Sequence, residues 1–501
     1  MLRPRRLLHG EITYSAAKEK ETNILHALGY WQRRLDLFNH LYRNRGSIED
    51  VARHHLGLGS AWTCHIAEPN DWLHWSFNLC VSIRLTNKRG APSKRLMIRF
   101  PLPYRVGEDY RPGNADEKLR CEAGTYAWMR ENCLFQFRAY KGLGFPTSKL
   151  YFTVLENLPF TTRLRHTVRR WLLGWLELRC PSQYVPHRMG NQILNKLGTG
   201  YLLLDYIEEK QERMLLETWN ENSQDEKRRA NLFRSLSQIL LTFARVPKPR
   251  IGSFVIDVYG YINLTNRPLT LEIQELENQE IPVNIPRQTT YSTVNSYVHD
   301  ILETHDSRLC HQPNTVNDTE DGLFQMSALT VMKAVSSHFF SPDFRRGPFF
   351  LSLTDFHQSN IFVDENWNIK YIAIDGIDQN VYDVVRNEFM HTLKEEEQKE
   401  RPQSPKLSQI LERGCQMGTF WYSLALDSPT GLFTLFYDHI QPRFAKGHID
   451  DPEFFDPNSL KLRWLTGLLT RQNSFSQRLK TKRRMMSVSV PNLTIEVPIQ
   501  S

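Results

Sequence analysis

The sequence contains no uninterrupted apolar run of the roughly 20 residues that a membrane-spanning helix needs. Residues 1–9 are basic but lack the apolar segment of a secretory signal. Glu11, Glu19 and Glu21 argue against a mitochondrial presequence, which stays open as a less favoured alternative. We therefore expect a cytoplasmic protein with no membrane partner.

Paired cysteines are also lacking. The seven cysteines are scattered, include no Cys-x-x-Cys motif and are odd in number. This usage is typical of a reducing compartment and argues against a disulfide framework or a structural zinc site. Apolar residues are plentiful, at 40% of the chain, so a sizeable core can form. The 501 residues suit either about three domains or two unequal lobes.

The formal net charge of +8 is thinly spread and gathers near the two ends of the chain. Arg3, Arg5 and Arg6 lie at one end, and residues 478–484 carry most of the excess at the other. Short basic runs in terminal segments are usually solvated or act as import signals. Because no known nucleic-acid-binding module accompanies them, we regard nucleic-acid binding as the least favoured function.

Residues 353–363 contain the most informative pattern in the chain. Asp355 is followed five residues later by Asn360, and Asp375 comes at the end of a second short apolar run. Turn residues 364–366 separate the two runs, which predicts a hairpin of 361–363 with 369–374. Kinase-like phosphotransferases use this order: the first acid accepts the proton of the attacking hydroxyl, and the asparagine and second acid bind Mg²⁺. An ordinary polar loop is the alternative.

Further runs strengthen the kinase interpretation. The chain resembles the fungal branch of the aminoglycoside phosphotransferase family, whose relatives include choline and homoserine kinases. The similar runs span roughly residues 60–450 and follow the order in which that branch shows them. Besides 353–363, the runs that carry the resemblance are 96–103, 111–118, 156–160, 198–206 and 265–269.

The resemblance implies an α+β, two-lobed protein-kinase-like fold, with a small mixed β-sheet N-lobe and a larger, mainly helical C-lobe. We expect a helical N-terminal extension (1–60), a nucleotide-binding N-lobe (61–207), a catalytic and substrate-binding C-lobe (208–470) and a disordered basic tail (471–501). Apolar periodicity predicts strands at 77–85, 96–100 and 201–207, a hairpin of 254–256 with 261–264, and helices at 116–132, 232–243, 327–340, 381–397 and 420–444. Residues 280–321 look looser and polar.

Two residues of the first lobe are candidates for a phosphate clamp. Arg99 occupies the position where the family resembles the lysine-bearing strand of kinases. Glu122 lies on the apolar stripe of the predicted helix, where an unpaired charge is costly, so we predict an Arg99–Glu122 ion pair. A glutamate at the rim of the helix that reaches solvent is the alternative. The resemblance also implies that Leu203, Asp205 and Tyr206 lie along the adenine of ATP.

Some positions depart from the family pattern. Trp75 stands where relatives usually have glycine, and Leu353 where they often have histidine. After Asp375 the chain runs almost directly into a predicted helix, so Asp375 is either a metal ligand or part of the turn before that helix. We therefore expect an ATP- and Mg²⁺-dependent phosphotransferase acting on a hydroxyl of a small molecule, with a catalytically impaired pseudokinase as the alternative. The sequence identifies neither the acceptor nor the oligomeric state.

Overall fold

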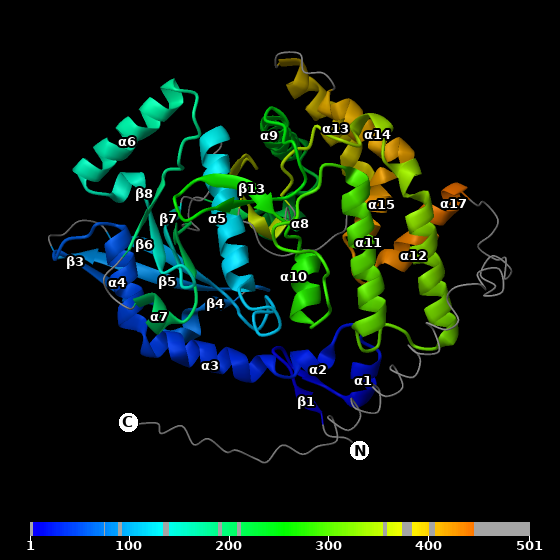
Figure 1. The fold of residues 1–501 in the computed structure, drawn as a ribbon, viewed down its shortest axis with the longest axis horizontal. Coiled ribbons are helices and arrows are strands. Elements are labelled where there is room, and N and C mark those ends of the chain that lie inside the picture. Colours follow the sequence, from blue (N-terminus) through cyan, green and yellow to red (C-terminus); the bar gives the residue numbers. More distant parts are fainter. Residues whose placement is uncertain are drawn as a thin grey trace.

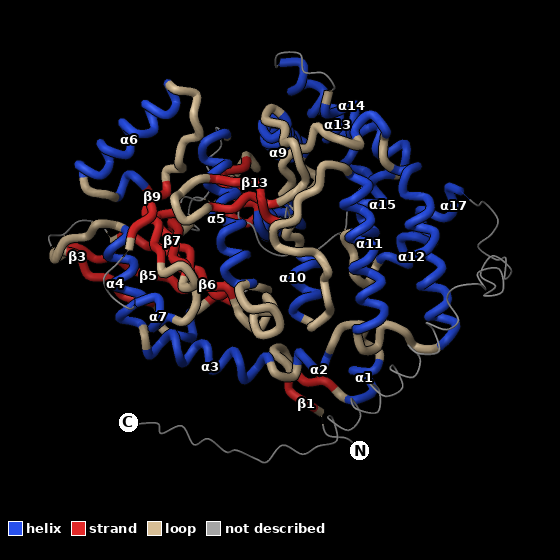
Figure 2. The backbone as a smooth tube through the Cα atoms, in the orientation of Figure 1, coloured by secondary structure: helices blue, strands red, loops and turns tan. Residues whose placement is uncertain are grey.

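The computed structural model describes residues 4–74, 76–88, 93–133, 140–188, 193–207, 212–353, 358–372, 383–399 and 406–444. These residues form an α+β protein in which a β-sheet lies on one side and most of the helices on the other (Figures 1 and 2). Helix α3 (Tyr30–Arg43) extends along the lower edge of the sheet toward the helical region (Figure 1).

The main sheet has eight strands in the order β3-β5-β6-β10-β7-β8-β9, with β4 paired to β5. The strands are β3 (Trp62–Ile66), β4 (Leu73–His74), β5 (Asn78–Asn87), β6 (Lys94–Pro101), β7 (Tyr140–Phe145), β8 (Leu150–Val154), β9 (Tyr184–His187) and β10 (Tyr201–Asp205). The predicted strands at 77–85, 96–100 and 201–207 overlap β5, β6 and β10.

The prediction of a mixed sheet is wrong for the part of the chain that the structure describes, because every strand pairing there is antiparallel. For the pairs that are neighbours both in sequence and in the sheet, the physical reason is the length of the connections. Strands β5 and β6, like β7 and β8, are joined by short links, whereas parallel neighbours need a crossover of a dozen residues or more.

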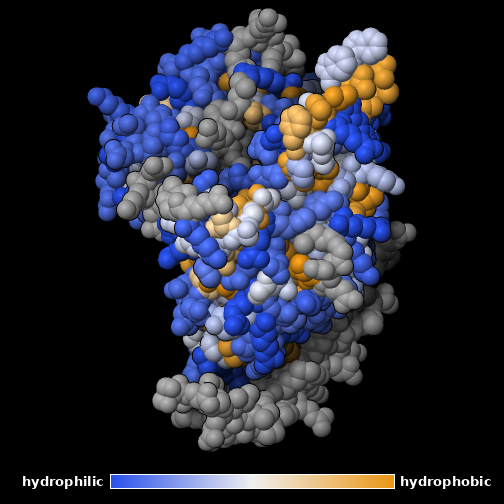
Figure 3. All heavy atoms as spheres, turned by 90° about the vertical axis from the view of Figure 1, so that its left-hand side faces the viewer, coloured by the Kyte–Doolittle hydropathy of each residue, from blue (hydrophilic) through white to orange (hydrophobic). Residues whose placement is uncertain are grey.

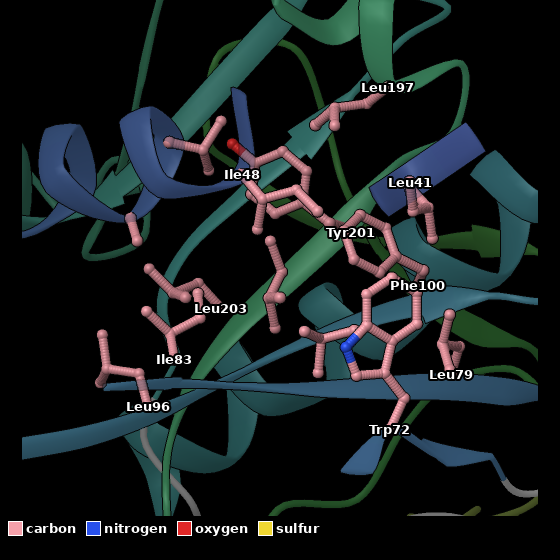
Figure 4. Packing of buried hydrophobic residues seen from close by; sticks show 14 of the residues in the cluster. Leu41, Ile48, Trp72, Leu79, Ile83, Leu96, Phe100, Leu197, Tyr201 and Leu203 are labelled. Atoms are coloured by element: carbon pink, nitrogen blue, oxygen red, sulfur yellow. The ribbon is translucent and has the colours of Figure 1, made fainter. Parts of the chain in front are cut away.

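The sheet is covered by helices on both faces. Because successive side chains of a strand point to opposite faces, Leu203 packs toward α3 and α4 (Arg45–His55), while Leu202 and Leu204 pack toward α5 (Asn114–Asn132). Figure 4 shows the first of these cores, with Leu203 among residues that include Leu41 of α3 and Ile48 of α4. The N-terminal helices therefore share a hydrophobic core with the sheet.

Helix α5 connects the sheet to the chain that follows it. It packs closely on the hairpin of β12 (Ser253–Ile256) and β13 (Ile262–Asn266). The antiparallel pairing of these two strands confirms the predicted hairpin. A Cβ atom on Gly124 of α5 would lie 2.7 Å from the backbone of Val255, so only glycine allows this approach. Helix α9 (Glu226–Ala244) is capped by Asp225 and ends shortly before Pro247, close to the predicted end.

The helical region surrounds a separate hydrophobic core. Its helices are α10 (Leu271–Asn278), α11 (Val294–His311), α12 (Thr319–Phe339), α13 (Asp383–Lys399), α14 (Leu407–Met417), α15 (Thr419–Leu426), α16 (Leu432–Leu435) and α17 (Gln441–Phe444). The interpretation of 280–321 as loose chain is wrong, because α11 lies within it. Histidines and acids dilute its apolar pattern, yet Val298, Ile301 and Leu302 are buried and Thr293 caps its start.

Residues 4–60, which were predicted to form a helical N-terminal extension, contain mostly helices and begin with a short hairpin. Residues 4–60 contain β1 (Arg5–Arg6), β2 (Glu11–Ile12), α1 (Tyr14–Lys18), α2 (Ile24–Ala27), α3 and α4. Five further α-helices of the described residues were not predicted: α6 (Phe160–Trp175), α7 (Ile193–Leu197), α8 (Leu215–Asn222), α10 and α14. The predicted tail, 471–501, lies outside the described residues.

Candidate functional site

The hairpin predicted to carry the catalytic motif is present. Strands β14 (Ile361–Val363) and β15 (Ile369–Ile372) pair antiparallel, with Ile361 opposite Ile372. The carboxylate of Asp364 holds the turn by accepting hydrogen bonds from the backbone N–H groups of Asn366, at 3.0 Å, and Asn368, at 2.9 Å. A short strand, β11 (Arg213–Met214), pairs with β14 and makes a three-stranded sheet.

Asn360 lies immediately before this hairpin, at the end of a short 3₁₀ segment, Gln358–Asn360, and its side chain is buried. Asp355 and Asp375, its predicted partners in catalysis and metal binding, fall outside the described residues. Their roles, and the predicted convergence of Asn360 and Asp375 on one Mg²⁺ ion, stay predictions.

The predicted Arg99–Glu122 ion pair is confirmed. Ile98 and Phe100 of β6 point into the core against α3 and α4, so Arg99 between them points to the opposite face, toward α5. There its Nη2 atom donates to Oε2 of Glu122 at 2.5 Å and to the hydroxyl of Tyr140 at 3.2 Å. Both charged side chains are buried, which excludes the alternative of a glutamate that reaches solvent at the rim.

Lys118, one helical turn before Glu122, is a second cation at the same carboxylate. Its ammonium contacts Oε1 of Glu122, and its side chain is buried as well. Burial alone would raise the pKa of the Glu122 carboxyl, but Arg99 and Lys118 together hold that pKa below its ordinary value. The cluster is thus one ionised carboxylate between two cations.

A cavity of about 320 Å³ opens beside this cluster. Lys118 and Glu122 lie on one wall, Lys248 and Arg250 on another, and Leu351 to Leu353 on a third. Backbone hydrogen bonds between Lys248 and Phe349, at 2.6 and 3.2 Å, hold the second and third walls together. Arg99 and Asn360, which the structure describes, do not line this cavity. Leu353 precedes Asp355 by two residues in the sequence.

Lys248 is a candidate binding residue that the sequence interpretation missed. Its ammonium lies 4.0 Å from the ring centre of Trp128, and burial lowers its pKa to about 8. A cation with a shifted pKa in a cavity is typical of functional sites. The sequence offers little signal for it, since Lys248 stands between Pro247 and Pro249, which mark only the end of a helix.

The predicted adenine-binding residues lie on or just after β10, next to the strand that carries Arg99. Leu203 pairs with Ile98 on one side and Gly142 on the other, and its side chain is in the core, so a nucleotide contact through its backbone would compete with the sheet. Asp205 forms a 2.9 Å ion pair with Lys141. The ring of Tyr206 lies 4.0 Å from the guanidinium of Arg95. Their predicted roles remain predictions.

Two of the family-like runs, 111–118 and 265–269, meet in a buried polar network. Arg267, with no exposed surface, donates to both carboxylate oxygens of Glu117 and to both of Glu277. Arg111 and Arg287 reach the same carboxylates from the outside. Because Arg267 is wholly enclosed, we assign this network to stability rather than to ligand binding.

No family model, curated protein or solved structure was found to match this chain. Within the described ranges, no cluster of three or more His, Cys, Asp or Glu side chains has the arrangement of a metal site. The helices of that same part of the chain are all too short or too polar to cross a bilayer.

Proposed function

We propose that this chain is an ATP- and Mg²⁺-dependent phosphotransferase acting on a hydroxyl of a small molecule, as its resemblance to the aminoglycoside phosphotransferase-like kinases implies. The observation that carries the proposal is the cavity beside the Glu122 cluster, whose third wall ends at Leu353, two residues before Asp355. In this proposal the arrangement is kinase-like: the sheet region, up to about residue 207, holds the nucleotide and the helical region holds the acceptor.

The cavity suits a polyphosphate in size and charge. Its volume lies at the lower end of the range of small-molecule sites. Lys118, Lys248 and Arg250 supply positive charge along the walls, and the charge of Glu122 is already balanced by Arg99. Phosphoryl transfer depends chiefly on positioning and on cations placed against the phosphates, so this lining is appropriate.

Asp355 would accept the proton of the acceptor hydroxyl, and the oxygens of Asn360 and Asp375 would hold Mg²⁺. Amide and carboxylate oxygens are the protein ligands that Mg²⁺ prefers. The bound ion would neutralise charge that develops on the phosphates. Glu122 keeps Lys118 oriented on the cavity wall, and Arg99 keeps Glu122 in place.

The test combines a binding and a turnover measurement. In the wild type, Mg-ATP at 100 times its dissociation constant should stabilise the fold by about 2.7 kcal/mol, seen as a rise in melting temperature. Asp355→Ala should retain this stabilisation but abolish ADP formation with a panel of hydroxyl acceptors. Asp343→Ala, which removes an exposed carboxylate, is the matched control and should change neither. Absence of any Mg-ATP stabilisation in the wild type would overturn the proposal.

One observation favours a second candidate, a kinase-like binding module without turnover. The resemblance implies that Arg99 is the phosphate-pairing cation, yet this residue is buried behind Glu122 and does not line the described cavity. In such a module Mg-ATP stabilisation is weak or absent, and Asp355→Ala leaves every measured property unchanged. The same two assays therefore separate the candidates.

A further inference from the structure

Helix α6 has its polar side turned toward the protein and its apolar side turned outward. Apolar side chains recur along it at intervals of three and four residues, so they share one face of the helix. Every member of this apolar face is exposed, from 45% to 74% of its surface: Phe160, Leu164, Val168, Trp171, Leu172, Trp175 and Leu176. Globular proteins normally bury such a face, and a continuous exposed one marks an interaction site.

The inner side of α6 is fixed by polar contacts. Nε2 of His166 lies 3.0 Å from the carbonyl oxygen of Ser182. Arg170 donates to Glu131 at 2.9 Å, and Arg169 donates to the hydroxyl of Tyr261 at 3.1 Å. The helix is therefore held in a defined orientation that presents its apolar face to the outside. Figure 1 places α6 at the upper left margin of the molecule, and Figure 3, which views that side, shows apolar side chains gathered at an upper edge.

The charges of α6 are all of one sign. The helix contains four arginines, Arg163, Arg165, Arg169 and Arg170, and no acidic residue. At 100° per residue, Arg163 falls along one border of the apolar face and Arg165 along the other, and both are exposed. Two copies of this helix packed face to face would bring their arginines together, which opposes self-association.

We propose that the apolar face of α6 docks this protein onto an anionic lipid membrane surface. Helices that lie in the membrane interface combine Trp, Phe and Leu on one face with basic residues beside it. Trp171 and Trp175 are the most exposed members of the helix together with Phe160, and tryptophan prefers the headgroup level of bilayers. Arg163 and Arg165 would bind lipid phosphates at the borders of the face. This contact is peripheral, so it needs no spanning helix and does not depend on the proposed enzymatic function. It departs from the expectation of no membrane partner, because that expectation rested on the lack of a spanning segment in the sequence.

The test is sedimentation of the full-length protein with sucrose-loaded vesicles of phosphatidylcholine alone or with 30% phosphatidylserine. We expect binding to the anionic vesicles, weak binding to the neutral ones, and loss of binding at high salt. Trp171→Ser with Trp175→Ser should lower the partition coefficient at least about tenfold. Arg163→Gln and Arg165→Gln should each lower it about fivefold.

Matched controls separate α6 from other apolar and basic surfaces. Leu73→Ser with Leu216→Ser removes two exposed apolar side chains elsewhere, and Arg53→Gln with Arg228→Gln removes two charges elsewhere. Both controls should bind as the wild type does, and all variants should keep its melting temperature. The basic segment 478–484 is intact in every variant, so its contribution cancels in these comparisons.

Three results would overturn the proposal. The wild type does not bind the anionic vesicles, or the tryptophan variant binds as well as the wild type. The third is that light scattering finds the wild type to be a dimer and the tryptophan variant a monomer, in which case the apolar face of α6 joins two copies of this chain.

Discussion

Arg267 and Glu117 form a two-point ion pair in the interior of the protein. Nε and Nη2 of Arg267 donate to the two carboxylate oxygens of Glu117, both at 2.9 Å, while Nη1 and Nη2 also donate to Glu277 at 2.7 and 2.9 Å. Glu117 lies on α5 beside the sheet, and Glu277 lies on α10 in the helical region. One guanidinium therefore connects the two regions of the fold.

Replacing Arg267 by methionine should destabilise the protein strongly. The substitution leaves two buried carboxylates without their main partner, which typically costs about 3–5 kcal/mol. A shift of the urea unfolding midpoint, followed by circular dichroism, measures the loss. Arg413→Met breaks an exposed pair with Asp343 and should cost less than about 1 kcal/mol. Equal losses for the two variants would mean that the buried network adds no more than a surface pair.

A second prediction concerns the pH dependence of stability. Burial, followed by the charge of Asp427, raises the pKa of Glu272 from 4.5 to about 8. Above pH 4.5 the unfolded chain releases the Glu272 proton, whereas the folded protein keeps it until the pH approaches 8. The contribution of the protonated Glu272 to stability is therefore complete below pH 4.5 and is lost as the pH rises through 8. The groups that act on Glu272 are Asp427, Thr270 and Glu275.

Glu272→Gln removes this titration. The free energy of unfolding of the variant relative to wild type should rise between pH 4.5 and 8.5, by at least about 1.4 kcal/mol, the equivalent of one pKa unit. Urea unfolding at pH 4.5, 6.5 and 8.5 provides the measurement. Glu221→Gln, at an exposed position on α8 and not among the groups that act on Glu272, is the control, and its difference from wild type should stay nearly constant. A constant difference for Glu272→Gln as well would contradict the raised pKa.

The elements that the sequence predicted are those with strong local patterns. β5, β6 and β10 have apolar β-forming runs, the hairpin of β14 and β15 has turn residues held by Asp364, and α9 has a proline stop. Helix α11 was missed because its polar residues dilute the apolar stripe. Helix α6 was overlooked although its apolar spacing is readable, and the outward direction of that face depends on tertiary contacts such as that of His166.

The same distinction applies to the candidate site. The Arg99–Glu122 pair was predictable because a charged residue on an apolar helix face requires a buried partner. Lys248 was not, because the backbone pairing with Phe349, far along the chain, brings it to the cavity. No local pattern encodes such a pairing. The parts of the motif that carry Asp355 and Asp375 lie outside the described residues, so their prediction rests on spacing and resemblance alone.

A third prediction tests the core between the sheet and α4. A Cβ atom on Gly142 of β7 would lie 2.2 Å from the imidazole of His55, which is buried between Thr153 and Tyr201 and bonded to both, at 2.6 and 2.8 Å. Because His55 has no exposed surface and both of its ring nitrogens are hydrogen-bonded, Gly142→Ala should cost about 1–3 kcal/mol. Gly46→Ala, on α4 with open space around it, should be neutral or stabilising by up to about 1 kcal/mol. Thermal unfolding of both variants checks the contrast, and similar melting temperatures would argue against this packing.

The last prediction concerns Lys248 and rests on the proposed function. With a pKa of about 8, its ammonium is largely charged at pH 7 and largely neutral at pH 9. If it contacts the phosphates, the affinity for Mg-ATP should be constant below pH 8 and fall by up to about tenfold per pH unit above it. Calorimetry between pH 7 and 9 measures this profile. Lys248→Arg keeps its charge and should remove the fall, Lys248→Met should bind weakly throughout, and Lys394→Met, at an exposed position, should follow the wild type. If the affinity of the wild type for Mg-ATP does not fall above pH 8, and Lys248→Met binds Mg-ATP equally well, the phosphates do not contact Lys248.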